Sequence, residues 1–387
     1  MSCARRPGRR SPRPWLAGAE PERYAGGLSK APWQAARDVG APMQYPFLST
    51  AFLDTLEETG AVDPRRGWAP CHLGGGDHFL PLYQRADSRG EYVFDFAWAD
   101  AYQRHGLPYY PKLVTAIPFT PVVGPRWRGD WSANALWEGV QERAREHGAS
   151  GWHLLFPDQL AREVLAELPL IGRQACHFRW FNRDYADFED FLGAFNSRKR
   201  KSVRRERRRI GEQGLSATRH SGARIEAHHW RFFYHCYANT YRVRGQRPYL
   251  SERFFLRLAE TLGEQLLMVL AWHQGEPVAA GLYLFDDHTL YGRYWGCVRE
   301  YDALHFEVCY YQGIEFAIER GLREFDPGVQ GEHKILRGFE PVITHSLHWL
   351  AEPAFHDAVA DFCQREARHV IGYRDEARTL LPYRREE

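Results

Sequence analysis

The stretch that decides the fold is TLYGRYWGCVREYDALHFEVCYYQGIEFAIERGLREFD, residues 289–326. Its first ten residues, rich in aromatic side chains, predict a strand. From Asp302 the apolar residues follow helical spacing, and Gly321 is a natural end for the helix. The run EFD at 324–326 then predicts a short strand. The stretch therefore predicts a strand, a long helix and a second strand, in that order.

The flanking sequence extends this pattern. HHWRFFYHCYANTYR (228–242) and SERFFLRLAETLG (251–263) predict two helices, and Ser251 suits the N-cap of the second. LLMVLAWH (266–273) and EPVAAGLYLF (276–285) predict strands joined by tight turns. VITHSLHWL (342–350) alternates as a strand, and its two faces are Ile343, Leu347 and Trp349, and Thr344, Ser346 and His348.

The first half repeats a similar order less clearly. We expect helices in 45–60, 95–106 and 131–148, a hairpin around GGGD (74–77), and strands in 109–126 and 150–157. We expect an α+β chain with a mixed sheet, made of two modules over 43–186 and 187–350. A basic, proline-rich leader over 1–42 is predicted to be disordered, and 351–387 is predicted to be a helical extension.

Charge is concentrated in two places. The chain has a formal net charge of +2, but SRKRKSVRRERRR (197–209) contributes +8 and residues 1–19 contribute +5, which leaves −11 for the remainder. A general nucleic-acid binder would spread positive charge over a face of its fold. The focused charge favours one phosphate-bearing ligand instead.

The composition also limits where the chain works. No stretch reaches the roughly 18 apolar residues that a membrane span needs. The 7 cysteines are odd in number and form no CxxC motif, which fits reduced thiols better than a disulfide framework. We therefore expect a cytoplasmic protein.

Four longer phrases carry a resemblance to a known family. YYPKLVTAIPFTPVVGPR (109–126), SRKRKSVRRERR (197–208), LHFEVCYYQGIE (304–315) and QGEHKILRGFEPVITHS (330–346) resemble hallmark phrases of the FemAB-like family. This family is labelled peptidoglycan biosynthesis/recognition or N-acyltransferase. The resemblance covers roughly residues 43–350 and implies two tandem modules of the GNAT acyltransferase fold. The FKxGF phrase of FemAB proteins reads ILRGF here, so Leu336 takes the lysine place and Lys334 lies two residues earlier.

The resemblance implies an N-acyltransferase that joins an activated acyl donor to a small-molecule or peptide amine. It leaves the donor open between acyl-CoA and aminoacyl-tRNA, with tRNA as a possible partner and no tightly bound cofactor or metal. Two alternatives stay open, a Fem-type aminoacyl-tRNA-dependent transferase acting on a cell-wall precursor and a non-catalytic recognition module. The oligomeric state stays open too.

Amide formation needs a base for the amine and a donor for the developing oxyanion. The candidate catalytic residues lie in two of the phrases and are Glu332, His333, Glu307 and His305. Glu307 falls on the apolar stripe of its helix, where a carboxylate is costly unless partnered, so it is either functional or paired with an arginine. The candidates for binding substrate or donor are Lys334, Arg337, Tyr110, Lys112, Arg126, Lys201, Arg204, Arg208, Gln312 and Gln330.

The basic run has its own prediction. Val203 and Ile210 are one heptad apart, which predicts a helix with a thin apolar seam. Its arginines could present forks to phosphates as one wall of a cleft between the modules. The alternative is a solvated helix paired with acids such as Glu189 and Glu212. Cys297 as a nucleophile, and zinc on His228, His229 and His235 or on His345 and His348, are weaker readings, because no supporting constellation or ligand spacing accompanies them.

Overall fold

The computed structural model describes residues 43–329 and 331–384. Pro42–Glu387 group into one compact unit. The predicted leader, residues 1–42, and the predicted binding residue Gln330 lie outside the described residues.

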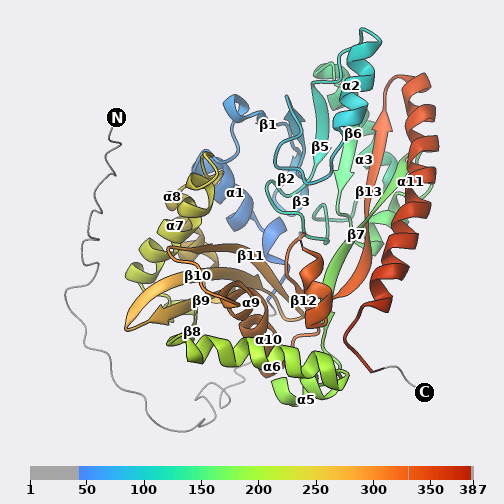
Figure 1. The fold of residues 1–387 in the computed structure, drawn as a ribbon. Coiled ribbons are helices and arrows are strands. Elements are labelled where there is room, and N and C mark those ends of the chain that lie inside the picture. Colours follow the sequence, from blue (N-terminus) through green and yellow to red (C-terminus); the bar gives the residue numbers. More distant parts are fainter. Residues whose placement is uncertain (1–42, 330, 385–387) are drawn as a thin grey trace, which may run out of the picture. The chain divides into compact units, whose positions relative to one another are not determined.

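One large mixed sheet runs through the described chain (Figure 1). In spatial order its strands are β1 (Trp68–Pro70), β4 (Tyr83–Arg85), β5 (Lys112–Thr115), β6 (Gly151–Leu155), β13 (Glu340–Leu350), β7 (Ile171–Phe181), β12 (Glu324–Asp326), β11 (Thr289–Cys297), β10 (Glu276–Phe285), β9 (Leu266–His273) and β8 (Leu215–Ser221). A separate hairpin, β2 (Leu73–Gly75) and β3 (His78–Leu80), forms at the predicted GGGD turn.

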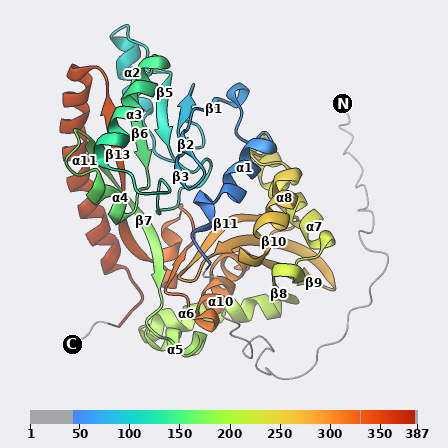
Figure 2. The same cartoon turned by 180° about the vertical axis from the view of Figure 1, so that it is seen from behind.

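The helices cover both faces of this sheet (Figures 1 and 2). They are α1 (Thr50–Glu58), α2 (Phe96–Arg104), α3 (Ala133–Glu146), α4 (Gln159–Val164), α5 (Phe188–Gly193), α6 (Ser197–Glu212), α7 (Ala227–Arg242), α8 (Glu252–Leu262), α9 (Leu304–Phe306), α10 (Gln312–Arg320) and α11 (Pro353–Thr379). Ser49 and Ser251 cap α1 and α8 by accepting backbone N–H groups, as predicted.

The last strand of each half pairs inside the other half. In the first half β5 is parallel to β6, and in the second half β11 is parallel to β12. β13 then lies antiparallel between β6 and β7, while β7 also pairs with β12. The predicted α+β class with a mixed sheet is therefore confirmed, and the two halves share one continuous sheet.

Alternation along β9 explains how the second half is packed. Leu267 and Val269 join one core with α5, α6 and α10, while Met268 and Leu270 join another with α1, α7 and α8. Successive strand residues point to opposite faces, so a strand that is apolar at every position is buried on both sides. The basic run forms α6 as predicted, and its seam residues Val203 and Ile210 are buried.

Candidate functional site

A cavity of about 550 Å³ lies where β11 and β12 part. The two strands pair in register only from Thr289 and Glu324 to Tyr291 and Asp326. The next residues on each chain line the cavity, which we call the splay cavity. Its lining residues are Tyr92, Pro121, Gly292, Arg293, His305, Tyr310, Pro327, Gly328, Val329, Gly331, His333 and Lys334.

A π-helical turn shapes one wall of the splay cavity. The predicted helix over 302–321 is present, but α9 and α10 are separated by a π turn at Glu307–Tyr311. Such turns are rare and frequent at functional sites. Here the two neighbouring tyrosines bind different partners, since Tyr310 bonds His333 and Tyr311 donates to Glu206 of α6.

His333 lies in the short 3-10 helix Glu332–Arg337, at the mouth of the splay cavity. Its Nε2 is 2.8 Å from the hydroxyl oxygen of Tyr310. Gly331 just before it has φ of +109°, and a Cβ there would approach the His333 ring to 2.2 Å. Glycine is therefore required at 331 for the ring to keep this place.

The electrostatics of the cavity favour neutral histidines. Burial, reinforced by Arg337 and Lys334, lowers the pKa of His333. Burial and the charges of His333, Lys334 and Arg337 lower the pKa of His305 to about 4. Burial also lowers the pKa of Lys334 to about 8, although Asp326 opposes the shift. The Lys334 Nζ donates to the carbonyl of Gly328 at 2.5 Å.

Arg337 is buried and binds protein groups through both of its terminal nitrogens, while its Nε has no hydrogen-bond partner among the described residues. It donates to both oxygens of Glu206 at 2.9 Å and to the His333 carbonyl at 2.7 Å. Its guanidinium carbon is 3.3 Å from the centre of the Phe306 ring. The ion pair to Glu206 therefore ties α6 to the segment that carries His333.

Glu307 faces away from the cavity toward α6. Arg207 donates to both of its oxygens, at 3.0 and 3.2 Å, and Gln312 donates at 2.7 Å. The carboxylate on the apolar stripe is thus partnered by an arginine, one of the two readings that the sequence left open. Neither Glu307 nor Gln312 lines the splay cavity.

The predicted residues of the first half are held in buried networks. Lys112 bonds Glu91 at 2.8 Å and also pairs with Asp95. Tyr110 bonds Ser88 at 2.8 Å, and Arg126 donates to the Leu155 carbonyl at 2.5 Å. None of these three side chains lines the splay cavity.

The predicted cations of α6 lie on its exposed side. Arg204 pairs with Glu189 at 2.5 Å and Arg208 approaches Glu212 at 3.8 Å, while Lys201 is exposed. Glu332 is also exposed, and it accepts a bond of 2.7 Å from the Tyr373 hydroxyl of α11. The structure thus brings His305, His333 and Lys334 together and places these four elsewhere.

Sequence reasoning missed Tyr310, Arg293 and Tyr92. Tyr310 lies inside one of the quoted phrases, but only the π turn decides which of the two tyrosines faces the cavity. Arg293 is a lone cation in an otherwise apolar strand, and that was the available signal. It donates to the Phe119 carbonyl at 2.9 Å.

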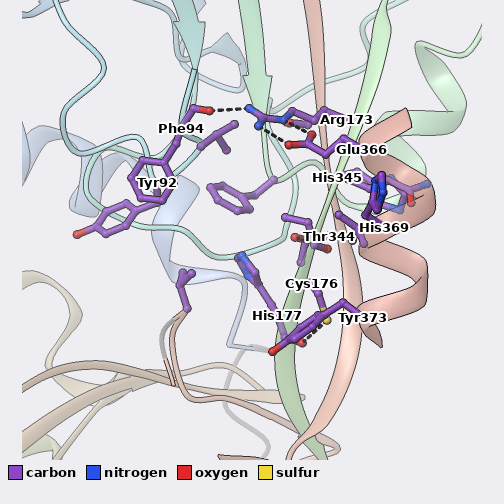
Figure 3. Close-up of a pocket in the computed structure, with 17 residues that line it drawn as sticks. Tyr92, Phe94, Arg173, Cys176, His177, Thr344, His345, Glu366, His369 and Tyr373 are labelled. Atoms are coloured by element: carbon purple, nitrogen blue, oxygen red, sulfur yellow. Dashed lines mark hydrogen bonds and ion pairs between the residues drawn. The ribbon is translucent and has the colours of Figure 1, made fainter. Parts of the chain in front are cut away.

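A second cavity of about 490 Å³ lies beside β7, β13 and α11 (Figure 3). It shares Tyr92 and Val329 with the splay cavity. Phe94 at its edge is 64% exposed and stacks on Phe96. In residues 43–329 and 331–384 no cluster of three or more His, Cys, Asp or Glu could hold a metal ion. The same residues form no helix that is long and apolar enough to cross a membrane.

Comparison with known proteins gives one family match. The FemAB-like family model, described as peptidoglycan biosynthesis/recognition, matches residues 26–385. A search of curated proteins found no match.

Several solved structures are distantly similar. FemX is 12% identical with a TM-score of 0.49, and the match covers 82% of this chain and 95% of FemX. L-PGS from Bacillus licheniformis is 12% identical with a TM-score of 0.48, covering 81% and 96%. A tandem GNAT protein from the clavulanic acid biosynthesis pathway is 11% identical with a TM-score of 0.35, covering 74% and 84%.

Proposed function

The chain belongs to the FemAB-like family, and from that premise we propose that it is an N-acyltransferase whose chemistry takes place in the splay cavity. It transfers an activated acyl group to an amine. The amide C–N bond forms, the bond between the acyl carbon and its carrier breaks, and the carrier leaves as the free CoA thiol or tRNA hydroxyl, which takes the proton that the amine loses. The observation that carries the proposal is the Tyr310–His333 contact beside the buried Lys334, in a cavity of about 550 Å³.

His333 is the proposed base. A lowered pKa keeps its ring neutral at pH 7, so one nitrogen can accept the amine proton. If Nε2–H donates to the Tyr310 oxygen, Nδ1 keeps a free lone pair. The same arrangement leaves the Tyr310 hydroxyl proton available to the substrate.

Tyr310 is the proposed oxyanion donor. Burial raises its pKa, so the hydroxyl keeps its proton at neutral pH. A donor aimed at the acyl oxygen stabilises the negative charge that develops there in the transition state. His305 shares an edge-to-face contact with Tyr310 at 5.3 Å and supports its ring.

The donor is proposed to be acyl-CoA, with aminoacyl-tRNA as the alternative. Lys334 and Arg293 bring positive charge to the cavity, and the exposed cations of α6 offer further charge to phosphates outside it. Glu206 and Arg337 position His333, and Glu307 anchors the π turn through Arg207.

A donor and acceptor panel tests this function. Purified protein is incubated with acyl-CoAs or aminoacyl-tRNAs and with amines that include a peptidoglycan precursor, and amide products are detected by mass spectrometry. We expect one donor class to give an amide that disappears in His333→Ala. If no donor acylates any amine while one of them still binds, the recognition-module alternative replaces the enzyme.

A further inference from the structure

The second cavity contains a hydroxyl group whose proton is already committed to the protein. Ser346 of β13 lines this cavity, and its Oγ is 2.7 Å from Nε2 of His348. His348 is 1% exposed, and its Nδ1 is 2.6 Å from Nδ1 of the equally buried His153 on β6. Which atom donates in each of these two hydrogen bonds depends on the group at the far end of the series of hydrogen bonds.

The series of hydrogen bonds that begins at Ser346 ends at the carboxylate of Asp95, and this fixes which group donates in each bond. Tyr109 donates its hydroxyl proton to Asp95 at 2.6 Å. The Tyr109 oxygen, 3.4 Å from His153 Nε2, is then an acceptor for a ring N–H. Burial raises the pKa of Asp95, but the Lys112 ammonium outweighs it and holds that pKa below its ordinary value, so Asp95 accepts.

The tautomers follow in order from Asp95. With its proton on Nε2, His153 accepts at Nδ1 from His348 Nδ1–H, so His348 Nε2 has no proton and accepts from Ser346. Burial lowers the pKa of His153 to about 3 and lowers that of His348 well below its ordinary value, so both rings are neutral. Ser346 therefore presents only lone pairs to the cavity.

Two other hydroxyl groups of the cavity lining also donate their protons to protein acceptors. Tyr373 donates its hydroxyl proton to Glu332 at 2.7 Å, and Thr344 points its hydroxyl at the Ala175 carbonyl at 3.4 Å. The Gln174 side-chain oxygen has no hydrogen-bond partner among the described residues, but it is fully buried and so is closed to a ligand in the cavity.

The one guanidinium of the cavity lining is already paired. Arg173 donates to both oxygens of Glu366, at 2.7 and 2.8 Å, and to the Phe94 carbonyl at 2.8 Å (Figure 3). Among the described residues, the lining then offers no free guanidinium or ammonium for an anion and no free carboxylate for an ammonium. Burial lowers the pKa of the lining residues His177 and His345, so each ring is neutral and has one donor and one acceptor.

We propose that the second cavity binds an uncharged nitrogen donor, a neutral amine or a carboxamide, whose N–H group is accepted by Ser346. Burying an ammonium ion without a partner charge would cost far more than burying a neutral N–H group. Tyr92 and Val329 line both cavities, so a ligand here lies next to the splay cavity. Resting on the proposed function, we assign this ligand as the acceptor, delivered as the uncharged amine that amide formation needs.

Three matched probes test the ligand class. Benzamide carries N–H donors, methyl benzoate is a neutral ester without them, and benzoate is an anion. We expect benzamide to bind about tenfold more tightly than methyl benzoate, which corresponds to roughly 1.4 kcal/mol for one satisfied hydrogen bond. Calorimetric titration of the full chain measures all three, and benzoate is expected to bind no better than the ester.

Two variants locate the binding. Ser346→Ala should weaken benzamide about tenfold and leave methyl benzoate unchanged. Ser346→Ala leaves the buried Nε2 of His348 without its hydrogen-bond partner, which could impair folding. Ala175→Trp, at an exposed position of the lining, therefore provides an independent block of the cavity. Ala358→Trp on the exposed side of α11 is its matched control.

The outcomes are distinct. Tightest binding by benzoate, equal binding of benzamide and its ester, or full benzamide binding in Ala175→Trp would each overturn the proposal. Benzamide binding that needs the open cavity supports the site even if no acyl transfer is found, in which case only its assignment as the acceptor site fails. Acyl transfer without benzamide binding would overturn the site and leave the proposed function intact.

Discussion

The hydroxyl of Tyr310 lies 2.8 Å from Nε2 of His333, across 22 intervening residues of chain. The π turn carries one partner and the 3-10 helix after β12 carries the other. Two separate elements meet at this contact, and it marks the part of the splay cavity where the proposed catalytic side chains lie.

Tyr310→Phe should remove the proposed oxyanion donor. We expect kcat to fall by about 10²-fold, the usual effect of losing one such donor, with a small change in KM. Tyr311→Phe is the matched control, because the neighbouring hydroxyl bonds Glu206 instead. Steady-state kinetics of both variants check this, and equal losses in the two would count against the assignment.

The pH profile should be shifted toward acid on its lower limb. A base must be unprotonated, and the lowered pKa of His333 means that activity persists below the ordinary histidine value of about 6.5. Lys334 loses its charge as pH rises through about 8, so KM for the donor should rise there. A lower limb centred above 6.5 would contradict the proposed base.

The Arg337–Glu206 pair should stabilise the fold far more than a surface pair does. Arg337 is largely buried, so Arg337→Ala leaves Glu206 facing a buried gap and should cost about 3 kcal/mol of unfolding free energy. Arg204→Ala breaks an exposed pair, with side chains 51% and 61% exposed, and should cost less than about 1 kcal/mol. Urea denaturation measures both, and similar costs would show that the buried pair has no special role.

Charge reversal on α6 tests whether its outer face meets phosphate. Arg204→Glu with Arg208→Glu should lower the melting temperature only slightly, because both side chains are exposed and their ion pairs contribute little. Binding of the phosphate-bearing donor should weaken, most strongly at low salt. The control is reversal of Arg143, an exposed cation of α3. Unchanged donor binding would leave α6 as a solvated structural helix.

The second half could be predicted well because its signals are local. Residues 266–272 are apolar at every position, Ser251 precedes a helix, and Gly321 ends one, and each signal acts within a few residues. β7 and β8 were missed. β7 alternates irregularly between buried and exposed positions, and its pairing with β13 and β12 joins segments far apart in the chain.

The site could be predicted only in part for the same reason. His333, Lys334 and His305 lie in two recognisable phrases, and the structure brings them to one cavity. An arginine partner was one of the two alternatives for Glu307, but which arginine it is, and which acids bind Lys112, could not be predicted, because an ion pair depends on which strand or helix packs opposite. The polar face of β13 is the clearest example of such a long-range partner. His348 is buried there, and it is hydrogen-bonded to His153 on β6.

The most direct test of the central claim is the turnover of His333→Ala once the donor is known. The account predicts a fall of about 10²–10⁴-fold with donor binding retained, the usual effect of removing a general base. His147→Ala, at the end of α3 and outside both cavities, should keep wild-type turnover. Wild-type turnover in His333→Ala would contradict the account and show that His333 in the splay cavity is not the base of the reaction.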